Sequence, residues 1–548
     1  MNQLKIRWTI WHRAISLLVL AATVIASGEL LAQQAVPEQK PVLMVSFASV
    51  DSLVGDASHL AKLVGFDENS MRMILPFLNG IDKTRPFGAV LNLEGIVPAP
   101  LMFIPVEDFK DAVATVELFL GKPEDAGDGI WEIGGPNGQT LYVKEQGGWA
   151  FVALSTDVLQ VVPENPVTIL EGLEQKYDIA IRGNIQNIAP GIRQLAIAKL
   201  KESVQSPLEL IEDEDERDQQ RQISENSIGQ LETVFKELES FTMGFNIDQD
   251  NQQVSFDVGI TAVEGTNMAQ NMAAMEEATS EFSGFLLPEA AANFQVVSLI
   301  AEADKKQFIS MLDSYRKRAL SELDDDTSLP DKDTRDGVKE VVNILFDVVL
   351  STIQSGRLDV GGALLLGQES FTLTAGGFVA DGLQLDAGVR KLIEMAKDQT
   401  EVQEVKFDVE TYEGVRFHAF QMPVPDEEAR AVLGDHLEVI VGFGEKSGYI
   451  AAGIGSLDLI KKVIESSSAQ SQEKVLPFQG QISLGSIANF AASVSDNPGA
   501  ALFASTFDDA EGNDRIIIQN IPELRGSISR IIVDESIIKA IGVTLLAQ

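Results

Sequence analysis

The stretch GGWAFVALSTDVLQVV, Gly147–Val162, contains a junction from which the fold class can be predicted. A glycine pair is followed by an aromatic-led apolar run, then by Ser-Thr-Asp, and then by a second apolar run. Glycine pairs favour hairpin turns, apolar runs rich in β-formers favour strands, and Ser or Asp favours the start of a helix. We therefore predict a hairpin turn, a strand at Trp149–Leu154 and a helix that starts at Ser155–Asp157.

The same plan returns at KSGYIAAGIGSLDLIKKV, Lys446–Val463, and neighbouring segments are echoed in the same order. The offset between the echoes grows along the chain, as insertions in a second copy would require. This shared order predicts an internal duplication, although any α+β chain can repeat strand-turn-helix patterns by chance. The other matched segments are Val45–Phe47 with Val297–Leu299, Phe87–Leu93 with Gly361–Gly367, Ile181–Ile188 with Ser483–Phe490, and Val254–Ala262 with Ile541–Ala547.

Short alternating runs joined by glycine-rich turns predict antiparallel hairpins at Gly129–Leu154, Val405–Pro423 and Leu437–Ile454. Amphipathic spacing predicts helices at Gln220–Ser240, Asp304–Leu323 and Asp336–Ile353. Strands with one apolar face need a cover, which such helices provide. We therefore predict an α+β fold of two related halves, each a mainly antiparallel sheet covered by amphipathic helices.

The first residues have the order of a secretory signal peptide: basic residues, an apolar core at Ala14–Ala26, and then small residues. The core of 13 residues is short for a membrane span, which needs about 20, although a membrane anchor is the alternative. We predict export to the periplasm, cell envelope or medium, and no membrane span in the mature chain. The predicted divisions are a signal peptide at 1–32, a linker at 33–41, and repeats at 42–283 and 284–548.

The composition excludes several kinds of chemistry and partner. The chain has no cysteine, which rules out disulfides, zinc-thiolate sites and thiol nucleophiles. Its net charge is −40, and the mature chain without residues 1–32 would be near −42. Such a field repels nucleic acids and anionic lipid surfaces, so we predict no nucleic-acid partner. An unknown protein or an apolar ligand remains possible as a partner.

Motifs for catalysis and for cofactors are missing from the sequence. The three histidines outside the signal peptide, His59, His418 and His436, are scattered, and neither a G-x-S-x-G nor an H-E-x-x-H motif occurs. GFGEKSG, Gly442–Gly448, superficially resembles a phosphate-binding glycine loop, but a strand follows it where such a loop needs a helix, so we predict a hairpin turn. We therefore assign no catalytic residue and no cofactor.

Acidic clusters leave a metal site undecided. Carboxylates suit calcium, which an exported protein encounters, but none of the clusters has the glycine placement of an EF-hand loop. A carboxylate pair for hydrolysis cannot be chosen among 82 acidic residues without geometry. The candidate clusters are Asn246, Asp248, Asp250 and Asp257; Asp331, Asp333 and Asp336; and Asp508, Asp509, Glu511 and Asp514.

Strand-to-helix units such as VSFASVDSL (Val45–Leu53) and YIAAGIGSLDL (Tyr449–Leu459) occur in an acidic, cysteine-free chain with a signal peptide. In these features the chain resembles large exported bacterial proteins that are classed as domains of unknown function. That resemblance supplies no catalytic residues. We predict a non-enzymatic binding or structural protein of the periplasm or cell envelope. The alternative is a carboxylate-based hydrolase or a calcium-dependent enzyme.

Overall fold

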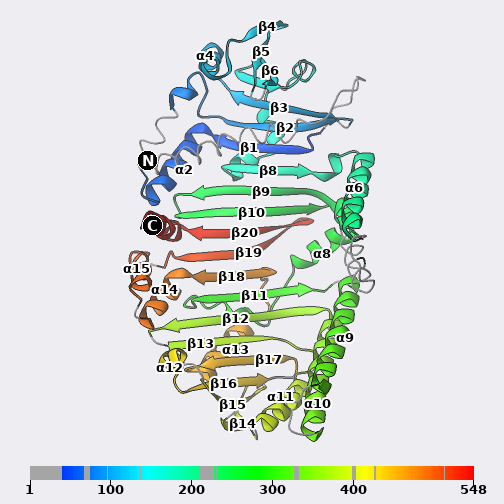
Figure 1. Cartoon of the computed structure of the whole chain (residues 1–548), viewed down its shortest axis with the longest axis vertical. Helices are drawn as coiled ribbons and strands as arrows, with labels where there is room; N and C mark the ends of the chain where they lie inside the picture. The colour runs from blue at the N-terminus through cyan, green and yellow to red at the C-terminus, as the bar shows by residue number, and fades with distance from the viewer. Residues whose placement is uncertain are drawn as a thin grey trace. The chain divides into compact units, whose positions relative to one another are not determined.

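A computed structural model describes residues 40–66, 75–95, 97–135, 138–208, 221, 228–229, 231–300, 302–325, 332–368, 370–397, 403–424, 427–495, 497–510 and 512–547 (Figure 1). The predicted signal peptide, 1–32, and most of the linker lie outside the described residues. Among the described helices, none is both long enough and apolar enough to cross a membrane.

The described residues fall into two compact units. The first lies within Met1–Gln249 and Phe256–Met268, and the second within Asp250–Ser255 and Ala269–Gln548. Strands of the first unit are β1 (Leu43–Ser49), β2 (Pro86–Glu94), β3 (Val97–Pro105), β4 (Glu124–Gly127), β5 (Ile130–Gly134), β6 (Thr140–Gln146), β7 (Trp149–Ala153), β8 (Ile179–Asn184), β9 (Leu238–Asp248) and most of β10 (Gln253–Ala262). Its helices include α2 (Val50–Leu63), α4 (Phe109–Leu120), α5 (Leu173–Lys176) and α6 (Pro190–Leu208), with short 3-10 turns η1 (Leu75–Leu78), η3 (Asp157–Leu159), η4 (Pro166–Leu170) and η5 (Ile185–Asn187).

The second unit contains most of α8 (Asn267–Met275) and the 3-10 turn η6 (Ser283–Phe285). Its strands are β11 (Ala292–Leu299), β12 (Arg357–Gly367), β13 (Ser370–Phe378), β14 (Gln403–Tyr412), β15 (Val415–Pro423), β16 (His436–Phe443), β17 (Ser447–Gly453), β18 (Phe478–Ser483), β19 (Arg515–Glu523) and β20 (Gly526–Asp534). Its helices are α9 (Glu302–Asp325), α10 (Lys332–Ser355), α11 (Gly382–Lys397), α12 (Glu427–Leu433), α13 (Ser456–Gln470), α14 (Leu484–Ser493), α15 (Pro498–Ser505) and α16 (Glu535–Ala547).

Strands of the described residues form one sheet of 20 strands. The prediction of two halves, each with a sheet of its own, is therefore wrong, although the α+β class holds. Sequence periodicity shows which face of a strand is buried, but the backbone groups at a strand's edge decide how many strands share a sheet. The hydrophobic pattern of the sequence therefore cannot show whether the strands form one sheet or two.

The order in which strands pair is nevertheless the same in two sets of ten. The first set is ordered β4-β5-β6-β7-β3-β2-β1-β8-β9-β10, and its strands from β4 through β9 pair antiparallel. The second is ordered β14-β15-β16-β17-β13-β12-β11-β18-β19-β20, again antiparallel. Raising each strand number of the first order by ten gives the second order.

The two predicted helices of the second half are confirmed as α9 and α10, and the three predicted hairpins are confirmed as β5–β7, β14–β15 and β16–β17. Three other element predictions are wrong. Where a helix was expected to start at Ser155–Asp157, the structure has only the 3-10 turn η3. The helix expected at Gln220–Ser240 ends earlier, because β9 begins at Leu238. The strand expected at Ile541–Ala547 is part of α16, which buries Ile537 and Ala540 at helical spacing. A short apolar run does not by itself distinguish helix from strand.

In each unit, one face of the sheet carries the larger core. In the first unit, Phe103, Phe151 and Trp149 pack with Leu159 and Leu170 from the 3-10 turns. In the second unit, α13 and η6 cover this face, where Phe285, Phe417 and Ile460 are fully buried. One helix of each unit covers part of the opposite face. In the first unit α4 lies over β6 and β7, and in the second unit α11 lies over β16.

Candidate functional site

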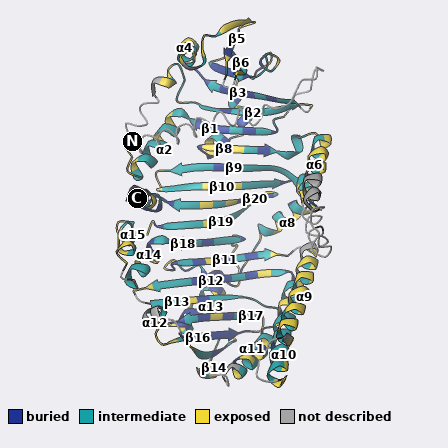
Figure 2. Cartoon of the chain, in the orientation of Figure 1, coloured by how far each residue is buried: buried dark blue, intermediate teal, exposed yellow. Residues whose placement is uncertain are grey.

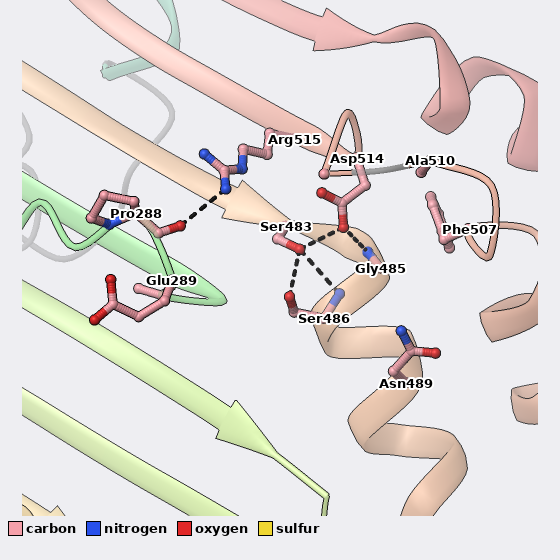
Figure 3. Close-up of a pocket in the computed structure, with 12 residues that line it drawn as sticks. Pro288, Glu289, Ser483, Gly485, Ser486, Asn489, Phe507, Ala510, Asp514 and Arg515 are labelled. Carbon is pink, nitrogen blue, oxygen red and sulfur yellow. Dashed lines mark hydrogen bonds between the residues drawn. The ribbon is translucent and has the colours of Figure 1, made fainter.

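A polar cavity of about 290 Å³ lies in the second unit, where β18 meets α14 (Figure 3). Ser483 caps α14, because its Oγ accepts a hydrogen bond from Ser486 N at 3.0 Å. Asp514 Oδ2 accepts bonds from Ser483 Oγ at 2.6 Å and from Gly485 N at 2.9 Å. A Cβ at Gly485 would lie 2.3 Å from Asp514 Oδ2, so only glycine fits this turn.

The cavity contains hydroxyls, and the carboxylate that accepts from one of them, Asp514, is also held by the helix cap through Gly485 N. The Ser483 proton is donated to Asp514, which leaves Ser486 Oγ, 2.7 Å away, to donate to Ser483. Histidine is missing from the cavity lining. The arrangement therefore has the hydrogen bonds of a capped helix end, and its lining does not contain the histidine and orienting group of a Ser-His-Asp site.

Charged groups at the cavity are also committed to structural contacts. Arg515 donates from Nη2 to the Pro288 carbonyl oxygen at 3.0 Å. The hydrogen bond from Lys462 lowers the pKa of Glu289, which therefore stays ionised and paired. Two carboxylates and one guanidinium line the cavity, so it offers no net positive field for an anion.

The most buried histidine lies in an ionic network beneath α11. His418 on β15 is fully buried; its Nδ1 accepts a hydrogen bond from Asp408 N at 3.0 Å, and its Nε2 lies 2.8 Å from Asp386 Oδ1. Nδ1 therefore carries no proton, and Nε2 donates to Asp386. Arg390 Nε binds the same carboxylate at 2.7 Å. With both ring nitrogens committed, His418 holds α11 to the sheet. The structure places His59 on α2 and His436 at the start of β16.

The calcium candidates are dispersed. Among the described residues, no cluster of three or more His, Asp or Glu side chains is arranged to hold a metal ion. Asp257 is buried and accepts a hydrogen bond from the Tyr177 hydroxyl at 2.9 Å. Asp333 and Asp336 lie within α10, whereas Asp331 and Glu511 fall outside the described residues. Asp514 is the carboxylate at the α14 cap described above.

The second unit also carries an open apolar face. Side chains directly opposite each other on paired strands point to the same side of a sheet, so the strand register defines three rows across β17, β13, β12, β11, β18, β19 and β20. Nineteen of the 21 positions are apolar or glycine, and none is charged. The rows are Ala452–Leu373–Leu364–Ala292–Ile482–Ile516–Val533, Ile450–Ala375–Gly362–Phe294–Gly480–Ile518–Ile531, and Gly448–Gly377–Val360–Val296–Phe478–Asn520–Ser529.

Solvent reaches this face although it is apolar (Figure 2). Its larger side chains retain between 37% and 50% of their accessible surface, namely Phe294, Leu373, Ile450, Ile482, Ile518 and Ile531. The same face is buried beside them, because Val439 and Val441 on β16 continue the first two rows beneath α11. At the opposite end of the first row, Ile516 and Val533 pack against α14–α16. Helices thus border the rows and leave their middle uncovered.

The first unit has a face of the same kind. Its rows run across β3, β2, β1, β8 and β9, and every position is apolar or glycine. Val152 on β7 continues one row beneath α4. This face is richer in aromatic residues, and the rings of Phe47 and Phe87 stack at 4.8 Å. The rows are Phe87–Phe47–Ile179–Phe245, Met102–Ala89–Val45–Ile181–Met243 and Pro100–Leu91–Leu43–Gly183–Phe241.

Comparison with protein-family models, with curated proteins and with solved structures gave no match. The sequence does not predict the open faces, because apolar and polar residues alternate in each strand as they do in an ordinary half-buried strand. In β18, FQGQIS reads as an apolar face opposite a Gln/Ser face, and such a strand is expected to bury the apolar side. Here Ile482 is exposed and Ser483 is buried. Strand pairing, which the sequence does not show, places these exposed positions in continuous rows.

Proposed function

We propose that this protein is an exported, non-enzymatic binding protein of the periplasm or cell envelope, and that an apolar ligand binds on its open sheet faces. The observation that supports this proposal is the uncharged second row of the second-unit face, which runs from Ile450 to Ile531. Its larger side chains are exposed in a chain of net charge −40, namely Ile450, Phe294, Ile518 and Ile531. Soluble proteins rarely expose large contiguous apolar patches, and those that do use them to bind partners or ligands.

The polar groups of the α14 cavity and of the His418 network favour a binding role over a catalytic one. At the cavity beside α14, Ser483 and Asp514 are engaged in capping, and the buried His418 donates and accepts within the fold. Ligand sites are lined predominantly by apolar side chains with a small number of polar groups. The open rows meet this need, with Asn520 and Ser529 as the polar positions among them.

The proposal can be tested with a neutral dye whose emission rises in apolar surroundings, such as Nile red. Lysines would replace Ile450 and Ile518 on the second-unit face, and Ile181 and Met243 on the first-unit face. These side chains are exposed, so a lysine can keep its ammonium group in water while it adds charge to the row. We expect each pair of substitutions to lower the dye bound at saturation by about half, and all four together to lower the affinity at least tenfold.

Leu524→Lys is the matched control. Leu524 is 80% exposed in the turn between β19 and β20, away from the rows, and we expect its substitution to leave dye binding unchanged. Circular dichroism would check that every variant keeps its strand content. If the protein with all four lysines bound the dye as tightly as the Leu524→Lys variant, the open faces would not be the ligand site.

A further inference from the structure

Resting on the proposed function, we infer that the ligand of the second-unit face is the hydrocarbon chain of an acyl lipid with an uncharged head group. The face is the set of three rows across β17, β13, β12, β11, β18, β19 and β20. Its shape, side-chain chemistry and charge each limit the occupant, and they agree on this class of ligand.

The side chains of the face suit an aliphatic chain. Its exposed residues are chiefly Ile and Leu, and its one exposed aromatic residue, Phe294, has its ring over Gly362, where a Cβ would lie 2.7 Å from Phe294 Cε1. Gly480, on the other side of Phe294, is buried, and a Cβ there would lie 3.3 Å from Phe294 Cβ and 3.5 Å from Phe478 Cζ, so the two phenylalanines fill the space above it. The stacked phenylalanine rings that could bind a flat ring system belong to the first-unit face instead.

The length of the rows also fits a lipid chain. Seven strands spaced about 4.8 Å apart give rows of about 29 Å. The hydrocarbon core of a bilayer, which is two acyl chains deep, is about 30 Å thick. One extended chain therefore crosses about half of a row, and its whole length can lie on uncharged side chains.

Charge selects a neutral head group. No Lys or Arg lies in the three rows to pair with a phosphate or carboxylate, and the net charge of −40 repels anions. The same repulsion opposes both an anionic membrane surface and a second copy of this chain. At the end of the third row, Asn520 Nδ2 lies 3.4 Å from Ser529 Oγ. This pair can exchange hydrogen bonds with the hydroxyl or ester groups of a glycerol head.

The test uses monooleoylglycerol as the neutral probe and oleate as the anionic probe with the same chain. In the full mature protein, monooleoylglycerol should displace Nile red from the second-unit face. Oleate should compete at least tenfold more weakly at low salt, and this gap should narrow in 0.5 M NaCl because salt screens the repulsion. Lysines at Ile450 and Ile518, or the milder Ile518→Thr, should weaken monooleoylglycerol binding. The double variant Asn520→Leu, Ser529→Ala should bind monooleoylglycerol severalfold more weakly and bind Nile red as tightly as the wild type.

The outcomes separate this inference from the proposed function. If the lysine variants lose the dye but monooleoylglycerol never displaces it, the lipid assignment is wrong and the binding face stands. If oleate competes as well as monooleoylglycerol at low salt, the head group is not selected by charge. If the wild type sediments as a dimer and the lysine variants as a monomer, the face binds a second copy of this chain. If the protein floats with anionic vesicles, the face binds a membrane surface. If the lysines leave dye binding intact, the proposed function itself is wrong.

Discussion

Two carboxyl groups of the first unit, Asp56 on α2 and Asp178 just before β8, are each only 7% exposed. Gln249 Nε2 donates to Asp56 at 2.7 Å, and Ile247 N donates to Asp178 at 2.7 Å. Burial raises the pKa of Asp178, and the neighbouring Asp56 adds to this, while the bond from Ile247 opposes it. The fold therefore accommodates Asp178 better as a neutral carboxyl than as a carboxylate.

Asp178→Asn should make the first unit less sensitive to pH. A raised carboxyl pKa contributes stability that is present below the unfolded-state pKa and is lost as pH rises through the folded-state value. Between about pH 4 and pH 7, the wild type should therefore lose stability relative to Asp178→Asn, whose amide oxygen can still accept from Ile247. Thermal unfolding of both proteins at the two pH values measures this difference. An equal difference in melting temperature at both pH values would contradict it.

At the same scale, the two tryptophans outside the predicted signal peptide differ in burial although residue type is the same. Trp149 is 4% exposed and edge-on to Phe103, whereas Trp131 is 38% exposed on β5, and β6 lies between the two strands. Residue type predicted burial on average, but the cover over each strand decided it.

At the scale of elements, adjacent glycines of β12 distinguish the two faces of the sheet. A Cβ at Gly361 would lie 2.6 Å from Phe285 Cδ2 and 2.9 Å from the Phe282 carbonyl oxygen. A Cβ at Gly362 would lie 2.7 Å from Phe294 Cε1. The clashes are similar in size, but Phe285 is fully buried and Phe294 is 41% exposed. Only the second neighbour has room to move.

We therefore expect Gly361→Ala to lower the free energy of unfolding by about 1–3 kcal/mol, as overpacking of a filled core does. Gly362→Ala should cost less than about 1 kcal/mol, because alanine suits a strand better than glycine and Phe294 can rotate away. Urea unfolding of the two variants, followed by circular dichroism, compares them directly. Equal losses would show that the Phe294 face is as tightly packed as the Phe285 face.

Elements with long periodic patterns were predictable, and those with short apolar runs were not. The residues of α9 and α10 keep helical spacing over 24 residues each, and the glycine turn at Gly444 is closed by its hydrogen bond to Ser447 O at 3.0 Å. By contrast, the pattern at Ile541–Ala547 predicts a strand, where the structure has the end of α16. Helix and strand patterns coincide in seven apolar residues, and packing against α14 and α15 selects the helix.

For the whole molecule, the charge of −40 is a property that the sequence fixes without reference to the fold. Self-repulsion of this size destabilises a compact state. Raising NaCl from 10 to 300 mM should therefore raise the melting temperature, because the Debye length falls from about 30 Å to below about 10 Å. Calorimetry at constant pH measures the shift, and sodium sulfate at matched ionic strength distinguishes screening from salt exclusion. A melting temperature that fell with NaCl would contradict this expectation.

The sequence by itself determined the α+β class, the antiparallel hairpins, the acidic cysteine-free surface and the absence of standard catalytic motifs. These properties follow from composition and from patterns of fewer than about twenty residues, which local physics governs. Only the tertiary structure decided that the strands share one sheet, that Ser483 and Asp514 cap a helix, and that apolar rows stay open beside α4 and α11. Alternation gives each strand an apolar side, but which side is covered depends on strands and helices that are distant in the sequence.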